Sequence, residues 1–233
     1  IKAGAKVTFD MEFEGQLPSK NFIRTHQSFL VNRLRIDSIK NITFYLGVIQ
    51  VLMGTMAVLT MPLYIESFTW VSDVLKHVLK TTEMGYTFYN ILTASLAILI
   101  MVPAAFFAGM TLPLLTMILM KKGENEKAIG NVYAFNTLGA LFGVWFAIHV
   151  GMVYLGLKYM IIAGSLIDFI LGGVLLFKAT KGSGKKLRNI LILIYLSIVL
   201  IVIFAVDFSP RKLASGTYRY ARDSFADNAE VVY

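Results

Sequence analysis

Two ionisable side chains, His149 and Asp168, stand inside long apolar stretches of the sequence. Burying an ionisable group in lipid is costly, so such groups usually face a partner or a water-filled path. The pair therefore suggests a proton relay or a cation pathway. His149 lies near the expected end of its helix beside Gly151, where interfacial water could hydrate it instead. Asp168 lies nearer to the centre of its helix and is the better candidate.

Asn136 is the third residue that we consider for a substrate or ion pathway, and two glycines follow it. Gly139 and Gly143 are four residues apart and therefore lie on one helical face. Without side chains, this face lets a neighbouring helix approach closely, so both glycines are predicted to mediate helix packing. Asn136 lies on much the same face. A hydrogen bond between helices explains it as well as a substrate contact does.

Motifs for soluble enzyme chemistry are missing from the sequence. The chain has no cysteine, which excludes disulfides, thiolate metal sites and cysteine nucleophiles. It also has no Gly-x-Gly-x-x-Gly, His-Glu-x-x-His or Gly-x-Ser-x-Gly pattern. We therefore predict no catalytic residue, no metal ligand and no cofactor site in this chain.

The composition indicates a protein that faces lipid. Of its 233 residues, 57% are hydrophobic and 15% are charged, whereas about 25% are charged in ordinary soluble domains. Stretches with almost no charged residue are each long enough to cross a bilayer as a helix. They cover Asn41–Ile65, Met84–Met120, Ala128–Leu157, Tyr159–Phe177 and Asn189–Val206.

These stretches predict an all-α integral membrane protein with five or six transmembrane helices. The number depends on Met84–Met120, which Pro103 and Pro113 interrupt. It forms either one long kinked helix that emerges from the bilayer or two short crossings. Residues 66–83 mix apolar and charged side chains, which predicts a helix lying in the membrane interface.

The first 40 residues differ from the rest. Thr8–Glu14 alternates apolar and polar residues, and Ser28–Asn32 is also strand-like, so we expect a short β-rich soluble segment. Lysine and arginine concentrate in this segment, in Lys121–Lys127 and in Lys178–Arg188. The positive-inside rule places all three on the cytoplasmic side. We therefore expect a protein of the bacterial inner membrane with a cytoplasmic N-terminus.

The apolar part resembles the membrane domain that is fused to spermidine synthase-like aminopropyltransferases. The resemblance covers roughly residues 44–233 and includes a Tyr-x-x-Asn-Thr-x-Gly-Ala core. The segments that carry it are Pro103–Leu115, Ile129–Ala140, Gly151–Leu157 and Phe208–Tyr220. It implies an anchor or scaffold for an aminopropyltransferase domain, which would use decarboxylated S-adenosylmethionine. The family's nucleotide loop and catalytic aspartate match no position of this chain, so no catalytic residue carries over.

A second resemblance concerns the N-terminal segment. Leu17–Asn32, followed by Ile36–Ile39, resembles part of a LytTR-type DNA-binding domain through the pattern Phe-x-Arg-x-His-x-Ser-x-x-Val-Asn. The loop that approaches DNA in that family corresponds here to Arg24, His26 and Gln27. Arg and Gln side chains can contact base edges or phosphates. The family's further strands would follow Ile39, where this chain has apolar sequence instead.

Three functions follow from the sequence. The first is a membrane anchor for a fused or associated aminopropyltransferase domain. The second is a transporter-like module for a polyamine or another small cation, and the third is a membrane-tethered LytTR-type transcriptional regulator with DNA as its partner. For all three we expect a soluble segment at 1–41, a transmembrane domain at 42–206 in contact with the lipid bilayer, and a polar linker at 207–233.

Overall fold

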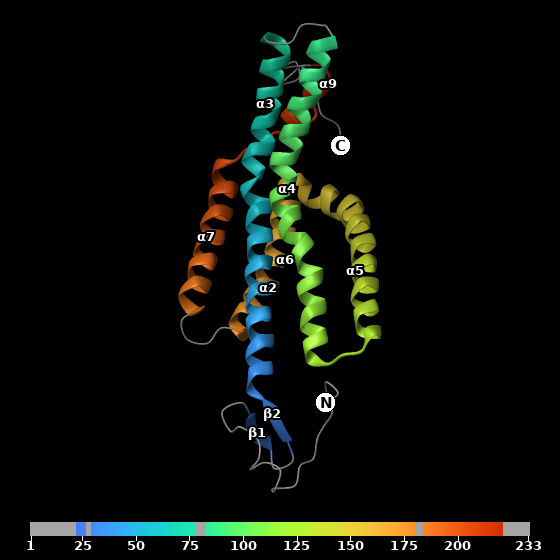
Figure 1. Cartoon of the computed structure of the whole chain (residues 1–233). Coiled ribbons are helices and arrows are strands. Elements are labelled where there is room, and N and C mark those ends of the chain that lie inside the picture. The colour runs from blue at the N-terminus through green and yellow to red at the C-terminus, as the bar shows by residue number, and fades with distance from the viewer. Residues whose placement is uncertain (1–21, 27–28, 78–82, 180–183, 221–233) are drawn as a thin grey trace.

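The structure is a computed structural model of the whole chain. It describes residues 22–26, 29–77, 83–179 and 184–220. The described part is an elongated bundle of helices with a small hairpin of strands at one end (Figure 1).

The hairpin consists of β1 (Phe22–His26) and β2 (Phe29–Asn32), which pair in antiparallel fashion. The register shifts between Arg24 and His26, as at a β-bulge. The described residues hold this one hairpin and no larger sheet. They therefore do not support a β-rich segment over the first 40 residues, and the strand predicted at Thr8–Glu14 lies outside them.

Two helices follow the hairpin in nearly one line. Helix α2 covers Arg33–Leu59 and α3 covers Met61–His77, with Thr60 between them. The backbone N–H of Thr60 still donates to the carbonyl of Met56, at 3.1 Å, so the helical direction continues into α3 (Figure 1). Over residues 66–77, α3 therefore extends α2 instead of forming a separate helix, and residues 78–82 of the predicted interfacial helix lie outside the described residues. Its location in the membrane interface stays a prediction.

Helix α4 (Glu83–Lys122) is a single helix of 40 residues with Pro103 and Pro113 inside it. Of the two alternatives that the sequence left open for Met84–Met120, the structure thus has the single long helix. At 1.5 Å per residue the helix is about 60 Å long, roughly twice the thickness of a hydrocarbon core. Its first half lies beside α3, beyond the ends of the other long helices (Figure 1).

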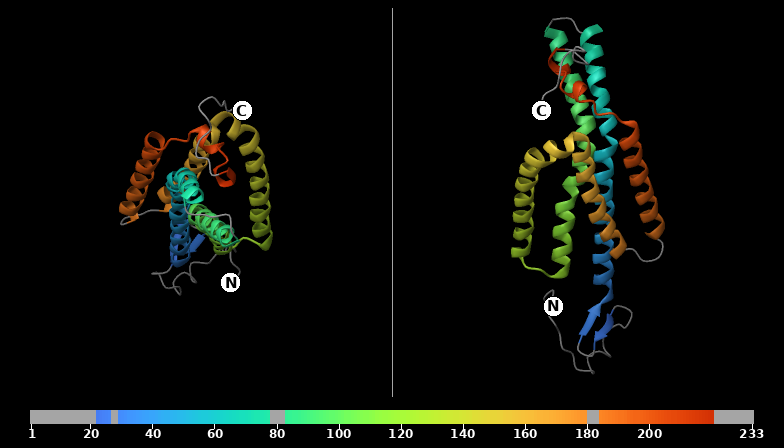
Figure 2. Two further views of the ribbon diagram at one scale, coloured as in Figure 1. Left: turned by 90° about the horizontal axis from the view of Figure 1, so that it is seen from above. Right: turned by 180° about the vertical axis from the view of Figure 1, so that it is seen from behind.

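The next helical stretch folds back on itself. Helix α5 (Glu126–Phe146) continues into a π-helix, η1 (Ala147–Leu155), and α6 (Gly156–Ala179) then runs in the opposite direction (Figures 1 and 2). The reversal takes place over η1 and Gly156 (Figures 1 and 2), and the φ of Gly156, 67°, lies in the left-handed region that glycine adopts without strain.

Helix α7 (Gly184–Ala205) completes the long helices, and two short helices follow, α8 (Pro210–Leu213) and α9 (Thr217–Tyr220). The end of α7 is held by the side chain of Lys158. Its Nζ donates to the carbonyl oxygens of Ile203, at 2.9 Å, and Val206, at 2.6 Å. These carbonyls lie at the C-terminal end of a helix, where a cation also interacts favourably with the helix dipole.

Helix α2 is the central element of the bundle. It packs mainly against α6 and α4, and α7 contacts it on a further side (Figures 1 and 2). Val51 and Leu176 are fully buried where α2 meets α6, and Val58, Met61 and Val202 form a second buried cluster near the end of α7. Dispersion contacts between these side chains stabilise the bundle.

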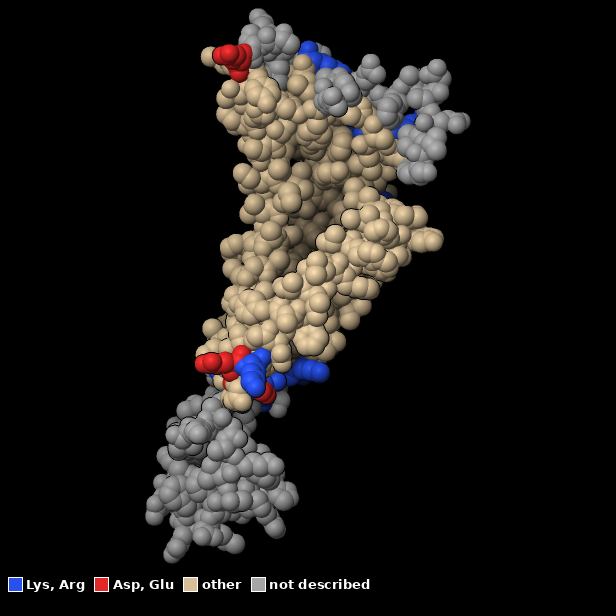
Figure 3. Space-filling view, turned by 90° about the vertical axis from the view of Figure 1, so that its right-hand side faces the viewer, with Lys and Arg blue, Asp and Glu red and all other residues tan. Residues whose placement is uncertain are grey.

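The outer surface of the bundle is apolar. Large side chains such as Phe135 and Phe204 are 73% and 82% exposed. Figure 3 shows charged residues gathered toward the two ends of one face, with an uncharged belt between them. The described residues contain four helical stretches long and apolar enough to cross a membrane, Ile39–Lys76, Glu83–Lys122, Glu126–Ala179 and Gly184–Ala205. The predicted helices are thus long and apolar enough to cross a membrane, and the third stretch contains the two antiparallel helices α5 and α6.

Candidate functional site

Asp168 occupies the middle of the apolar part of α6. The nearest charged residues on this helix are Lys158 and Lys178. They are 20 positions apart and thus about 30 Å apart along the helix, the thickness of a hydrocarbon core. The carboxylate is half-buried, and its Oδ1 accepts a hydrogen bond of 2.8 Å from the Nε2 of Gln50 on α2. A carboxyl group at this depth thus has an amide partner from the neighbouring helix, as the cost of burying it requires.

A second polar pair lies one turn away on α6. The Ser165 hydroxyl donates to the carbonyl of Ile162, at 2.8 Å, and has only one hydrogen to give. The Tyr195 hydroxyl on α7, 3.1 Å from Ser165 Oγ, must therefore be the donor in their contact. The Tyr195 ring stacks on Phe169 at 4.0 Å between centroids and is 1% exposed. The two pairs give α2, α6 and α7 a shared polar cluster within the apolar bundle.

Glycines bring α2 and α6 close enough for these contacts. A Cβ built at Gly54 would lie 2.7 Å from the carbonyl oxygen of Ser165 and 3.3 Å from the Cβ of Asp168. Gly54 is one turn after Gln50, so the absence of a side chain here allows the Gln50 amide to reach Asp168. Gly47 and Gly172 make similarly close approaches between the same helices. The sequence analysis missed these residues, although the spacing of Gly47 and Gly54 by two helical turns was a usable signal.

Asn136 lies on α5 with an exposed side chain, and it lines a pocket of about 570 Å³ together with Gln50. The structure thus places Asn136 across a pocket from the partner of Asp168. His149 lies elsewhere, exposed within η1. Its Nδ1 is 2.9 Å from the carbonyl oxygen of Trp145, and its ring stacks on the Trp145 indole at 5.4 Å. His149 therefore does not join the polar cluster around Asp168.

The faces of Gly139 and Gly143 are open in the single chain. Within the described part of the chain, no atom lies within 4 Å of a Cβ built at either position. Helix packing through these two glycines therefore remains a prediction, and it requires a partner other than the described helices. The close glycine contacts of this chain are made by α2 and α6 instead.

The residues predicted to approach DNA lie at the N-terminal hairpin. Arg24 and His26 are in β1, where Arg24 is opposite Leu30 and His26 is opposite Phe29. Gln27 lies outside the described residues. The hairpin is joined directly to the start of α2.

Comparison with known families gives one match. The LytTr DNA-binding domain family matches residues 10–50 of the chain, which include both strands and the first two thirds of α2. The strands that this family would form after Ile39 are not formed here, because α2 runs from Arg33 to Leu59. No curated protein and no solved structure gives a significant match to the chain. The resemblance to spermidine synthase-like fusions is therefore unsupported, whereas the LytTR resemblance is supported over a minor part of the chain.

Proposed function

We propose that the chain is a membrane-anchored regulator whose N-terminal LytTR-like segment binds DNA. The match to the LytTr DNA-binding domain over residues 10–50 carries this proposal. The matched stretch ends inside α2, and the same helix continues into the first apolar stretch. Residues 39–50 belong both to the matched stretch and to a helix that is long and apolar enough to cross a membrane, so no linker separates the two.

The distribution of charge agrees with a cytoplasmic hairpin. The end of α4, the start of α5, the end of α6 and the start of α7 all lie at the end of the bundle that carries the hairpin (Figure 1). This end holds Lys121, Lys122, Lys178, Lys185 and Lys186. Positive charge concentrates on the cytoplasmic side of membrane proteins, where DNA is accessible in bacteria. We therefore propose an N-terminus inside the cell and an inner-membrane location.

The test is DNA retention by the full chain in lipid nanodiscs. A mixed pool of duplex DNA is passed over the immobilised protein, and the retained molecules are sequenced at several salt concentrations. We expect selective retention that weakens with salt, because contacts to phosphate release counterions. Arg24→Ala should weaken binding by about 1–3 kcal/mol, the usual value of an Arg contact to DNA. Lys127→Ala, which removes an equal charge at an exposed site on α5, is the control.

The proposal fails if the retained pool is unselected in sequence, or if Arg24→Ala and Lys127→Ala weaken binding equally. Either result would show general attraction of DNA to a basic surface.

The role of anchor for an aminopropyltransferase, which the sequence led us to expect, has its own test. Co-purification of such an enzyme with the full chain would support it. The division into residues 1–41, 42–206 and 207–233 is likewise a proposal, since α2 runs through its first boundary.

A second candidate function is movement of a small cation through the bundle. The observation that favours it is the pairing of Asp168 with Gln50 at the middle of the apolar belt. The test is uptake of radiolabelled spermidine or sodium into proteoliposomes. Saturable uptake that Asp168→Asn abolishes would support this function, and equal uptake by the variant and the unaltered chain would exclude Asp168 from it.

A further inference from the structure

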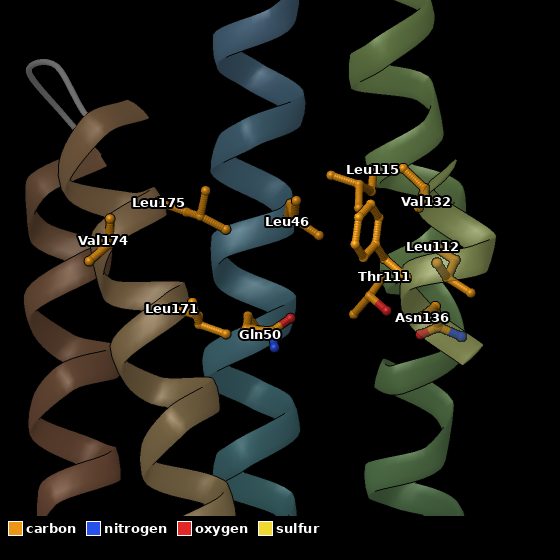
Figure 4. Close-up of a pocket in the computed structure, with 11 residues that line it drawn as sticks. Leu46, Gln50, Thr111, Leu112, Leu115, Val132, Asn136, Leu171, Val174 and Leu175 are labelled. Atoms are coloured by element: carbon orange, nitrogen blue, oxygen red, sulfur yellow. The ribbon is translucent and has the colours of Figure 1, made fainter. Parts of the chain in front are cut away.

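A pocket lies between α2, α4, α5 and α6 at the depth of the apolar belt (Figure 4). Its volume of about 570 Å³ falls in the range of small-molecule sites. Most of its wall is leucine and valine. The helices present Leu46, Leu112, Leu115 and Leu171 to it. The three polar lining residues are Gln50, Thr111 and Asn136.

The orientation of Gln50 determines which polar atom it offers to the pocket. A carboxylate is an acceptor, so the nitrogen of the Gln50 amide must face Asp168, to which it donates at 2.8 Å. The amide oxygen is left on the other side, and Figure 4 shows it pointing toward Thr111. In the part of the chain that the structure describes, the hydrogen bond found for the Gln50 amide is the one from its nitrogen to Asp168. Gln50 therefore presents a hydrogen-bond acceptor to the pocket.

The other two polar residues that line the pocket can also accept a hydrogen bond from a ligand. The Thr111 hydroxyl gives its hydrogen to the carbonyl of Ala108, at 2.8 Å, so toward a ligand its oxygen can only accept. The exposed Asn136 amide can accept or donate. Two acceptors and one amide thus face a cavity with apolar walls. This set suits a ligand that donates a hydrogen bond from one end and is apolar along its length.

The ligand should also be uncharged. All eleven lining residues are uncharged, and Asp168 is not one of them. A charged group would lose its hydration in this pocket without gaining an opposite charge, which costs far more than a hydrogen bond returns. A neutral donor such as a hydroxyl or an amide N–H avoids this cost.

We propose that this pocket binds an uncharged lipid-soluble molecule of the long-chain alcohol class, whose hydroxyl donates to the Gln50 oxygen. The occupant is argued from the position of the pocket. The helices that line it are long and apolar enough to cross a membrane, and the belt between their charged ends is uncharged, so the surroundings of the pocket suit a lipid-soluble molecule. The proposal does not depend on DNA binding, because the pocket and the hairpin use different residues.

The experiment is photolabelling of the full chain in phosphatidylcholine nanodiscs. Three probes share a chain of about sixteen carbons, the length of a lipid tail, with a diazirine at mid-chain. They end in a hydroxyl, a methyl or an ammonium group. Labelled peptides are identified by mass spectrometry. We expect saturable labelling of α2, α4 and α5 by the alcohol, about fivefold above the methyl probe, as one net hydrogen bond of about 1 kcal/mol implies. Labelling by the ammonium probe should be weaker still.

Variants separate the pocket from the general lipid-facing surface. Gln50→Leu should lower alcohol labelling to the level of the methyl probe. Val132→Phe, which places a larger side chain in the pocket, should lower labelling by both probes. Asn136→Leu should weaken alcohol labelling, whereas Asn131→Leu, an exposed amide on the same helix but outside the pocket, should not. Asn136 is exposed, so its replacement leaves the bundle intact even if Gln50→Leu does not fold.

Three results would overturn the proposal. Equal labelling by the alcohol and methyl probes would show only an apolar surface in contact with lipid. Stronger labelling by the ammonium probe would point to a cation site at Asp168. Equal effects of Asn136→Leu and Asn131→Leu would show that the pocket amide does not contact the probe.

Discussion

The contact between α2 and α6 yields the sharpest test of the structure, because two adjacent glycines have different surroundings. A Cβ built at Gly172 would lie 2.8 Å from the carbonyl oxygen of Gly47, 2.8 Å from Val51 Cγ2 and 2.9 Å from the Val51 nitrogen. Ordinary contacts begin near 3.5 Å, so Gly172→Ala requires the helices to separate by roughly 0.7 Å. Two of the three atoms are backbone and cannot rotate away. Within the described chain, a Cβ at Gly173 meets no atom within 4 Å.

The expected difference follows from this geometry. Both substitutions gain the same helix propensity, so their comparison isolates the overpacking, which typically costs about 1–3 kcal/mol. We therefore expect Gly172→Ala to be less stable than Gly173→Ala by this amount. The assay is reversible unfolding in mixed micelles as the fraction of dodecyl sulfate rises, followed by circular dichroism. Equal free energies of unfolding for the two variants would refute the close packing of α2 against α6.

Three further predictions test other contacts. Lys158→Met should destabilise the bundle by about 1–3 kcal/mol in the same assay, because it leaves two carbonyls at the end of α7 without their donor. Lys127→Met, at an exposed site, is the control and should have little effect on stability. Asp168→Leu should lower the free energy of unfolding by about 1–3 kcal/mol, because it leaves the Gln50 nitrogen unpaired. Asp168→Asn keeps an acceptor oxygen and should lower it less. Equal losses of stability in the two variants would exclude this hydrogen bond. Gly139→Leu should leave the stability of the monomer unchanged. A loss of stability that appears only at a high protein-to-lipid ratio would reveal packing between chains through this glycine.

Composition and the pattern of charge were sufficient to predict the apolar helices. Burying the backbone in lipid requires every N–H and C=O group to be bonded internally, so a long uncharged stretch has almost no alternative to a helix. Asp168 could also be singled out from the sequence, because it is an ionisable residue in a stretch that is otherwise apolar. The LytTR-like pattern was also recognisable in the order of residues alone, and the family match over residues 10–50 supports it.

The partners of these residues depend on the tertiary structure. Gln50 and Asp168 are 118 positions apart, and no local pattern joins them. Their contact forms because Gly54 and Gly172 let α2 and α6 approach, whereas Gly139 and Gly143, with the more familiar spacing, face no neighbour among the described helices. Spacing along one helix determines which residues share a face, but it does not determine which helix lies against that face. That choice is made by the packing of the whole bundle, because each close contact requires matching surfaces on two helices.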